Sequence, residues 1–161
     1  MTNSKKVVLV GHFGVGKSSL IRRYVNDIFS DDYKVTIGVH IFKKTIALEN
    51  NDLTLILWDI EGKDDITEVR KSHLLGTSGF IYVFDPTRES TFKNISSELD
   101  FLNSNFPKAA VLTVANKSDL VDEASFIKDH EVAVNFFASA KTNSNVELIF
   151  KELGLNILND H

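Results

Sequence analysis

The sequence predicts an α/β fold in which a six-stranded, mostly parallel sheet carries helices on both faces. Apolar runs of strand length alternate along the chain with segments of helical periodicity, and this alternation is typical of parallel strands joined by helical crossovers. Only one pair of neighbouring strands, expected at 39–48 and 53–58, is joined by a short polar turn. That pair reads as a hairpin, so one edge of the sheet is predicted to be antiparallel.

The other early elements follow from the spacing of apolar residues. A strand at Lys6–Val10 precedes a helix at Lys17–Asn26, which has its apolar residues on one stripe. Gly79–Phe84 is nearly continuously apolar, as a buried parallel strand requires. We expect a long helix at Thr87–Ser104, because apolar residues recur there at i, i+3, i+7 and i+10.

The last part of the chain supplies two more strands and a final helix. The fifth strand is the apolar run at 109–115, the sixth is expected at Glu131–Phe137, and the last helix at Asn145–Leu158. Only Asp122–Asp129 remains for a fourth helix, which is therefore expected to be one or two turns, or largely loop. We expect a single domain over residues 1–161, because this length suits one sizeable core.

The composition of the chain argues against several classes of function. A net charge of −4 without a basic cluster argues against a nucleic-acid partner. The chain has no cysteine, so no disulfides are expected and it holds no cysteine to prenylate, and its scattered histidines are interpreted as surface or core residues. No signal peptide is visible, and no apolar run approaches the roughly 20 residues that span a bilayer. We expect a cytoplasmic monomer without a membrane anchor of its own, which a missing tail or a partner could still bring to membranes.

The most informative motif is the stretch from Gly11 to Ser18, which fits the phosphate-binding pattern G-x-x-x-x-G-K-[ST]. Glycines allow a tight turn whose N–H groups point at phosphate oxygens, and the following helix adds its positive end. Lys17 supplies a cation for the β- and γ-phosphates, and Ser18 a hydroxyl for Mg²⁺. An ordinary glycine-rich turn is the alternative, but the strand before and the helix after favour a phosphate site.

A second motif, Asn116-Lys117-Ser118-Asp119, follows the fifth strand. The Asp119 carboxylate can accept two hydrogen bonds from the N1–H and the amine of guanine, whereas adenine offers no such donors. Four polar residues after a strand usually form only a turn. Downstream of a phosphate loop, guanine recognition is the stronger reading, and ATP binding survives only if Asp119 does not face the base.

With these motifs the chain resembles the Ras-superfamily small GTPases, most closely the Rab branch, over nearly its whole length. Further stretches that carry the resemblance are Phe29–Tyr33, Thr36–Val39, Leu57–Gly62, Tyr82–Asp85 and Ser139–Lys141. The resemblance implies a P-loop NTPase small G domain that binds GTP or GDP with Mg²⁺. It also implies two switch loops, at 27–38 and 59–75, that recruit protein effectors and regulators.

The resemblance assigns roles residue by residue. Ser18, Thr36 and Asp59 are expected to hold Mg²⁺, Asp59 through a bound water; a strand-ending cap is the alternative for Asp59. Phe29 is expected to cover the guanine, with a core phenylalanine as the alternative. The full set of nucleotide-binding candidates is Phe13, Gly14, Val15, Gly16, Lys17, Ser18, Ser19, Phe29, Tyr33, Thr36, Gly62, Asn116, Lys117, Asp119, Leu120, Ser139, Ala140 and Lys141.

The departures from the family pattern lie around the γ-phosphate. After the switch II aspartate the family has Thr-Ala-Gly-Gln-Glu, and this chain has Ile-Glu-Gly-Lys-Asp at 60–64. The catalytic candidates are therefore Lys63, Gly62 and Glu61. Lys63 replaces the water-orienting glutamine but has no acceptor atom, and Phe13 would crowd the path of a partner's arginine. We expect either a slow GTPase switch or a nearly hydrolysis-dead GTP-binding scaffold; substitutions without kinetic consequence are a further alternative.

Overall fold

The computed structural model describes residues 3–29, 38–60, 62–63 and 65–159. Its six-stranded sheet has the order β2-β3-β1-β4-β5-β6. The hairpin partners β2 and β3 are antiparallel, and every other neighbouring pair is parallel. This confirms the mostly parallel sheet with one antiparallel edge pair. The strands are β1 (Asn3–Val10), β2 (Val39–Leu48), β3 (Asn51–Ile60), β4 (Gly79–Phe84), β5 (Ala110–Ala115) and β6 (Phe136–Phe137).

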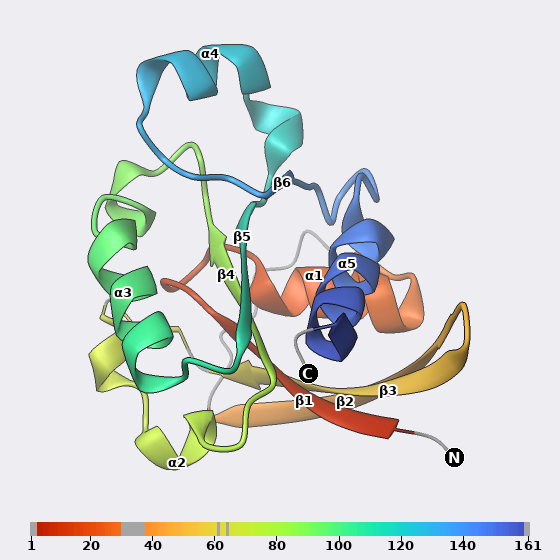
Figure 1. The fold of residues 1–161 in the computed structure, drawn as a ribbon. Helices are drawn as coiled ribbons and strands as arrows, with labels where there is room; N and C mark the ends of the chain where they lie inside the picture. Colours follow the sequence, from red (N-terminus) through yellow and green to blue (C-terminus); the bar gives the residue numbers. More distant parts are fainter. Residues whose placement is uncertain (1–2, 30–37, 61, 64, 160–161) are drawn as a thin grey trace.

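Helices cover both faces of the sheet, as expected (Figure 1). One face carries α1 (Lys17–Asn26) and α5 (Val146–Asn159), and the other carries α2 (Lys71–Leu74) and α3 (Ile95–Asn105). The fourth helix, α4 (Glu123–Asp129), has only seven residues, which confirms the short helix predicted there. Single 3₁₀ turns occur at Ile66–Glu68, Glu89–Thr91 and Ser118–Leu120.

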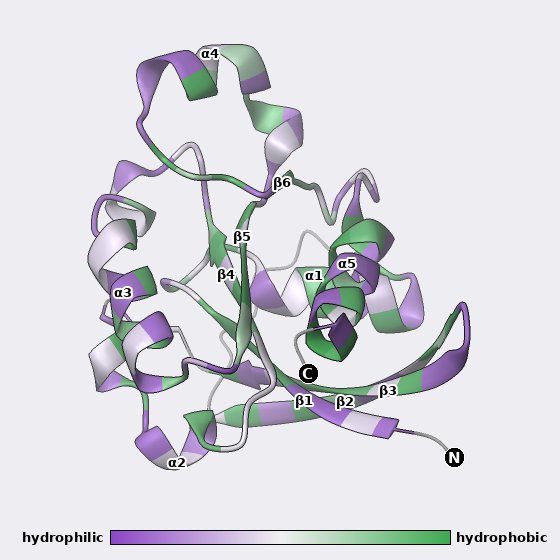
Figure 2. Ribbon diagram, viewed as in Figure 1, coloured by the Kyte–Doolittle hydropathy of each residue, from purple (hydrophilic) through white to green (hydrophobic). Residues whose placement is uncertain are grey.

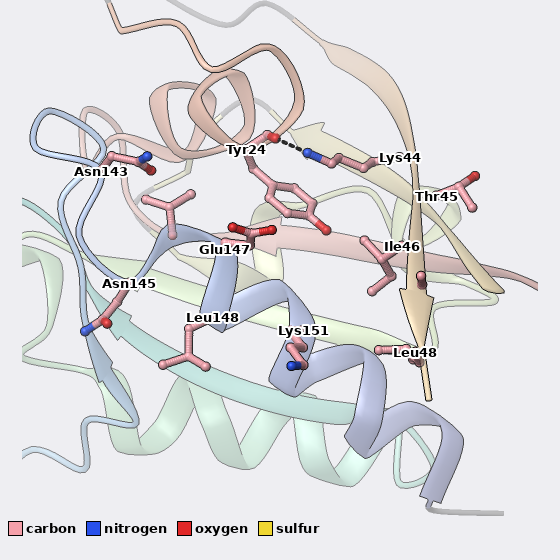
Figure 3. Close-up of a pocket in the computed structure, with 12 residues that line it drawn as sticks. Tyr24, Lys44, Thr45, Ile46, Leu48, Asn143, Asn145, Glu147, Leu148 and Lys151 are labelled. Atoms are coloured by element: carbon pink, nitrogen blue, oxygen red, sulfur yellow. Dashed lines mark hydrogen bonds between the residues drawn. The ribbon is translucent and has the colours of Figure 1, made fainter. Parts of the chain in front are cut away.

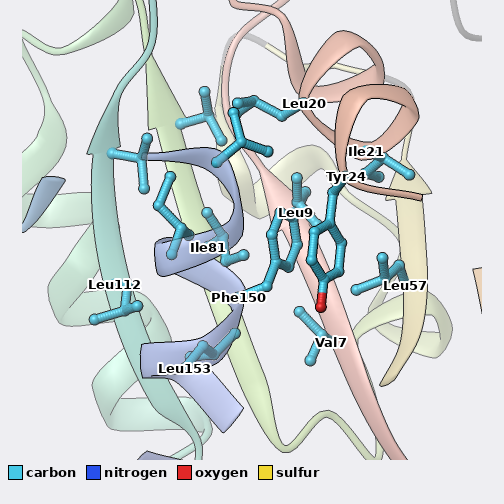
Figure 4. Close-up of a cluster of buried hydrophobic side chains, with 14 of the residues drawn as sticks. Val7, Leu9, Leu20, Ile21, Tyr24, Leu57, Ile81, Leu112, Phe150 and Leu153 are labelled. Carbon is cyan, nitrogen blue, oxygen red and sulfur yellow. The ribbon is translucent and has the colours of Figure 1, made fainter. Parts of the chain in front are cut away.

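The alternation of side chains along β1 divides the core into two layers. Val7 and Leu9 point into the cluster under α1 and α5, whereas Val8 and Val10 point into the cluster under α2 and α3. Figure 2 shows the hydrophobic residues along β4 and α5 that help to fill these layers. In the first layer, the rings of Tyr24 and Phe150 stack with their centroids 4.0 Å apart (Figure 4). This stack joins α1, which follows the phosphate loop, to the last helix.

Two predicted elements are shorter in the structure than expected. The sixth strand, expected at Glu131–Phe137, is confined to Phe136–Phe137. Before it, the regular ladder gives way to contacts that involve side chains: Thr113 N–H donates to Asn135 Oδ1 at 2.8 Å, and the Thr113 hydroxyl donates to the carbonyl of Ala133 at 2.7 Å. The Thr113 N–H, a backbone donor of β5 that a longer β6 strand would have paired, is bound by a side chain instead.

The helix predicted at Thr87–Ser104 is interrupted. A 3₁₀ turn covers Glu89–Thr91, and regular α-helix begins only at Ile95. The Thr91 side chain explains the break, because its hydroxyl accepts from Asp85 N–H at 3.0 Å and donates to the Arg88 carbonyl at 2.7 Å. A threonine that bonds to the local backbone in this way competes with continuous helix.

Candidate functional site

The phosphate loop runs from the end of β1 to the start of α1, at the carboxyl edge of the parallel strands. Gly16, the residue before α1, has φ +98°, and a β-carbon there would lie 2.2 Å from Asn116 Nδ2. Only glycine suits both the left-handed backbone and this close approach. Asn116 Nδ2 also donates to the Val15 carbonyl at 2.9 Å. The two predicted motifs, about a hundred residues apart in sequence, therefore lie in direct contact.

Lys17 is buried inside the loop. Its ammonium group donates to the carbonyls of Gly11 at 3.2 Å and His12 at 3.3 Å. Burial lowers the pKa of Lys17 to about 8, and the nearby Asp59 carboxylate partly offsets this effect. A desolvated cation among backbone carbonyls gains strongly from an anionic ligand, so its position suits a phosphate.

Two of the predicted metal ligands lie side by side. The Ser18 hydroxyl donates a hydrogen bond to Asp59 Oδ2, which links the loop to the end of β3. Asp59 is 2% exposed; burial raises its pKa, against the opposing effects of the Ser18 hydrogen bond and the Lys17 charge. A hydroxyl and a carboxylate are the oxygen donors that Mg²⁺ prefers. The third predicted ligand, Thr36, lies outside the described residues, as does Tyr33.

The switch II segment meets the phosphate loop at Gly62. A β-carbon on Gly62 would lie 2.8 Å from both Cα and N of Phe13, so its backbone packs directly on the loop. Lys63 follows it and is half-buried, whereas Phe13 is 43% exposed. Glu61 lies outside the described residues. Of the residues that depart from the family pattern, Phe13 therefore packs against Gly62, and Lys63 follows directly.

The predicted base-recognition residues gather on the other side of the loop. Lys117, with φ +60°, donates from Nζ to the carbonyl of Gly14 and to Asp85 Oδ2, both at 3.0 Å. Asp119 Oδ1 accepts from the Ser139 hydroxyl at 2.7 Å. Ala140 N–H lies 3.4 Å from Asn116 Oδ1. The motifs after β5 and β6 are thus brought together, while their roles toward a base stay predictions.

The remaining candidates differ in their surroundings. Phe29 is half-buried and packs against the core layer of α1 and α5, so its role over the base also stays a prediction. Leu120 and Lys141 are exposed, and Ser19 is half-buried in the first turn of α1.

Sequence reasoning missed a buried polar cluster beside the loop. His12, interpreted only as a surface or core histidine, lies with its Nε2 3.2 Å from Glu98 Oε1 on α3. The hydroxyl of Tyr82, on β4, donates to Glu98 Oε2 at 2.8 Å. Glu98 is 6% exposed. Its place three residues after Ile95, on the apolar stripe of the predicted helix, was a signal that could have marked it.

A separate hollow of about 720 Å³ lies between the edge strand β2 and the start of α5 (Figure 3). Lys44 and Tyr24 form part of its wall, and Lys44 Nζ donates to the Tyr24 carbonyl at 2.6 Å. None of the predicted site residues lines it. Across the described ranges, no helix is both long and apolar enough to cross a bilayer.

A glycine-rich loop between a parallel strand and a helix defines the phosphate-loop class of nucleotide-binding proteins. Comparison with known proteins narrows the class. A model of the Ras family matches residues 6–159. Human Ras-related protein Rab-32 is 37% identical, over 97% of this chain and 76% of the relative. Ras-related protein RABC1 of Arabidopsis thaliana is 36% identical, over 95% and 76%. Ras-related protein Rab-1 of Theileria annulata is 34% identical, over 90% and 70%.

The chain belongs to the Ras family of small GTPases, and within it to the Rab-like branch. It is accordingly a GTP-binding molecular switch.

Proposed function

We propose that this protein is a guanine-nucleotide switch that hydrolyses GTP slowly when unaided. The observation that carries the proposal is the meeting of Gly62 with the backbone of Phe13, which sets Lys63 at the end of the loop where the γ-phosphate is expected. In P-loop GTPases a glutamine at this point orients the attacking water. A lysine has donors but no acceptor, so it cannot accept a hydrogen bond from that water.

The nucleotide itself is proposed to bind along the contacts that join the motifs. Backbone N–H groups of the loop and Lys17 would hold the β- and γ-phosphates, because that cation is already desolvated among carbonyls. Ser18 and Asp59 would hold Mg²⁺, which neutralises charge on the bridging phosphate oxygens when bound. Asp119 would accept hydrogen bonds from the edge of the guanine base, and the hydrogen bond from the Ser139 hydroxyl would orient its carboxylate.

The expected reduction in the rate of GTP hydrolysis can be estimated. Family members with the glutamine turn over at roughly 10⁻⁴ s⁻¹ without an activator. Loss of water orientation is expected to cost about one further order of magnitude, or about 1.4 kcal/mol of barrier. Glu61 adds negative charge to a reaction that already concentrates it, and the Lys63 ammonium works against that effect.

A second candidate function is a scaffold that holds GTP almost permanently. The exposed ring of Phe13 favours it, since a bulky group at this point of the loop obstructs an arginine supplied by an activating partner. In both cases the switch loops, at 27–38 and 59–75, would carry partner binding.

The identity of the nucleotide that copurifies separates the two candidates. The bound nucleotide should be extracted from protein that was purified over a day, and then identified by ion-exchange chromatography. Mostly GDP supports the slow switch, and mostly GTP supports the scaffold. Adenine nucleotides, or equal affinity for ATP and GTP, would contradict both. Single-turnover hydrolysis of loaded GTP then gives the rate directly.

A further inference from the structure

Four consecutive residues of the phosphate loop are each held by a side chain from elsewhere in the fold. Asn116 bonds to the Val15 carbonyl, and Lys117 to the Gly14 carbonyl. Arg88 Nη1 donates to the Phe13 carbonyl at 3.1 Å, and Glu98 bonds to the His12 side chain. The first two contacts come from the base-recognition motif. The last two come from the segment between β4 and the middle of α3, to which the proposed function gives no part.

The contact between His12 and Glu98 is buried at both ends. The side chain of His12 is 10% exposed and that of Glu98 is 7% exposed. An ionised carboxylate can only accept, so a hydrogen bond in this contact uses the His12 tautomer that carries its proton on Nε2. The second carboxylate oxygen accepts from the Tyr82 hydroxyl at 2.8 Å, and burial raises the pKa of Tyr82 and keeps it a donor. A buried acid with both oxygens bonded holds its partners in one geometry.

His12 is also where three parts of the proposed site meet. Its carbonyl accepts from the Lys17 ammonium at 3.3 Å. Its carbonyl carbon is the third atom, at 3.1 Å, that a β-carbon on Gly62 would meet. A change in the His12 side chain therefore acts on the backbone that orients Lys17 and on the surface that receives switch II.

We propose that Glu98 is a positioning residue for the nucleotide phosphates, which acts through His12 and is itself oriented by Tyr82. This inference rests on the proposed phosphate site. Glu98 reaches the loop through the His12 side chain, so its proposed effect on a bound nucleotide is indirect. Its effect should appear in how long a nucleotide stays bound, and it links α3 to the phosphate loop.

The test measures release of a fluorescent GDP analogue from the full chain in Mg²⁺, chased with excess GDP. Glu98→Ala and His12→Ala should each release it about tenfold faster than the unmodified protein. The double variant should be no faster than either single variant, because both remove one contact. Glu98→Gln keeps an oxygen that accepts from His12 and should restore release to within about threefold of the unmodified rate.

Leu102→Ala is the matched control, since Leu102 is fully buried on the same helix but packs in the core layer of α2 and α3. It should lower resistance to urea without accelerating release. Where an alanine variant does not fold, Tyr82→Phe removes a donor to Glu98 with little change in volume and should also speed release.

Three results would overturn the inference: release unchanged in the His12 and Glu98 variants, additive effects in the double variant, or acceleration by Leu102→Ala equal to that of Glu98→Ala. An unmodified chain that fails to bind the GDP analogue would instead refute the proposed function, and the inference with it. Normal binding with unaltered release in the variants refutes the inference alone.

Discussion

The Ser18 hydroxyl donates a hydrogen bond to the Asp59 carboxylate, and this contact joins the first turn of α1 to the end of β3. Ser18 lies in a helix that was predicted from sequence and Asp59 at the end of a predicted strand, yet the two residues are 41 positions apart. The resemblance leads us to expect that both side chains hold Mg²⁺. Substitution of Ser18 therefore tests directly whether nucleotide binding depends on the metal.

Ser18→Asn should weaken binding of GTP more than binding of GDP. The metal neutralises negative charge on the γ-phosphate, so loss of a metal ligand weakens the binding of the triphosphate most. We expect at least about a tenfold greater loss for GTP, or about 1.4 kcal/mol, measured with a non-hydrolysable analogue in Mg²⁺. In the unmodified protein EDTA should speed release of both nucleotides. An unchanged release rate in EDTA would rule out the metal assignment.

Asp119→Asn should change the preferred base of the bound nucleotide from guanine to xanthine. The carboxylate offers two acceptors, whereas the amide offers one acceptor and one donor, which suits the extra carbonyl of xanthine. We expect GTP affinity to fall by about two orders of magnitude while XTP affinity rises. Competition binding measures both. Asp122→Asn is the control, because Asp122 caps α4 through Ser125 and should leave selectivity unaltered.

Gly62→Ala should separate the two nucleotide states. The added β-carbon would lie 2.8 Å from the Phe13 backbone, so switch II must move away from the loop. Binding of a GTP analogue should weaken about tenfold, while GDP binding stays within about twofold, because only the γ-phosphate is expected to use this backbone. Gly76→Ala is the control: it strains a turn with φ +74° but meets no atom within 4 Å. Equal losses for both nucleotides would show that Gly62 serves stability alone.

We expect the stability of the fold to depend on the ionisation of Asp85 at acidic pH. Burial of its carboxylate acts to raise the pKa, but bonds from the Thr87 hydroxyl at 2.6 Å, the Thr87 N–H at 2.9 Å and Lys117 outweigh it, and the pKa is lowered. A group with a lowered folded-state pKa stabilises the fold above its ordinary value of about 3.9 and loses that contribution as pH falls further.

Asp85→Asn should therefore reduce the free energy of unfolding at pH 7 by about 1–3 kcal/mol. The difference from the unmodified protein should shrink as pH drops from about 5 to about 2. Urea unfolding at several pH values checks this, with the exposed Asp100→Asn on α3 as control. A difference that stayed constant with pH would show that the charge of Asp85 is not the stabilising feature.

Local signals predicted most of the fold. The helix at Lys17–Asn26 has the predicted bounds because Gly16 supplies the left-handed turn before it and its apolar residues share one stripe. Gly79–Phe84 also matches, since an apolar run buried on both faces has few alternatives. The sixth strand was overestimated because the bonds of Thr113 to Asn135 and Ala133, which end it, form across 20 or more residues.

The same reason limited what could be predicted of the site. The motifs that contact a nucleotide in this family are continuous in sequence, and a pattern of spacing marks them. The contact of His12 with Glu98 spans 86 residues and depends on how α3 packs beside the loop. A glutamate on an apolar stripe indicates a buried acid, but only the packed structure identifies its partner.

The departures at switch II lead to the last prediction. Lys63→Gln combined with Glu61→Ala should speed intrinsic hydrolysis, because the glutamine side chain can both donate to and accept from the attacking water, and the alanine removes a charge next to the phosphates. We expect about a tenfold rise in the single-turnover rate at saturating Mg²⁺. Lys63→Gln alone separates the two contributions, since a lysine could also stabilise the γ-phosphate in cis. An unmodified rate equal to that of ordinary relatives, unmoved by the double change, would show that these substitutions have no kinetic effect.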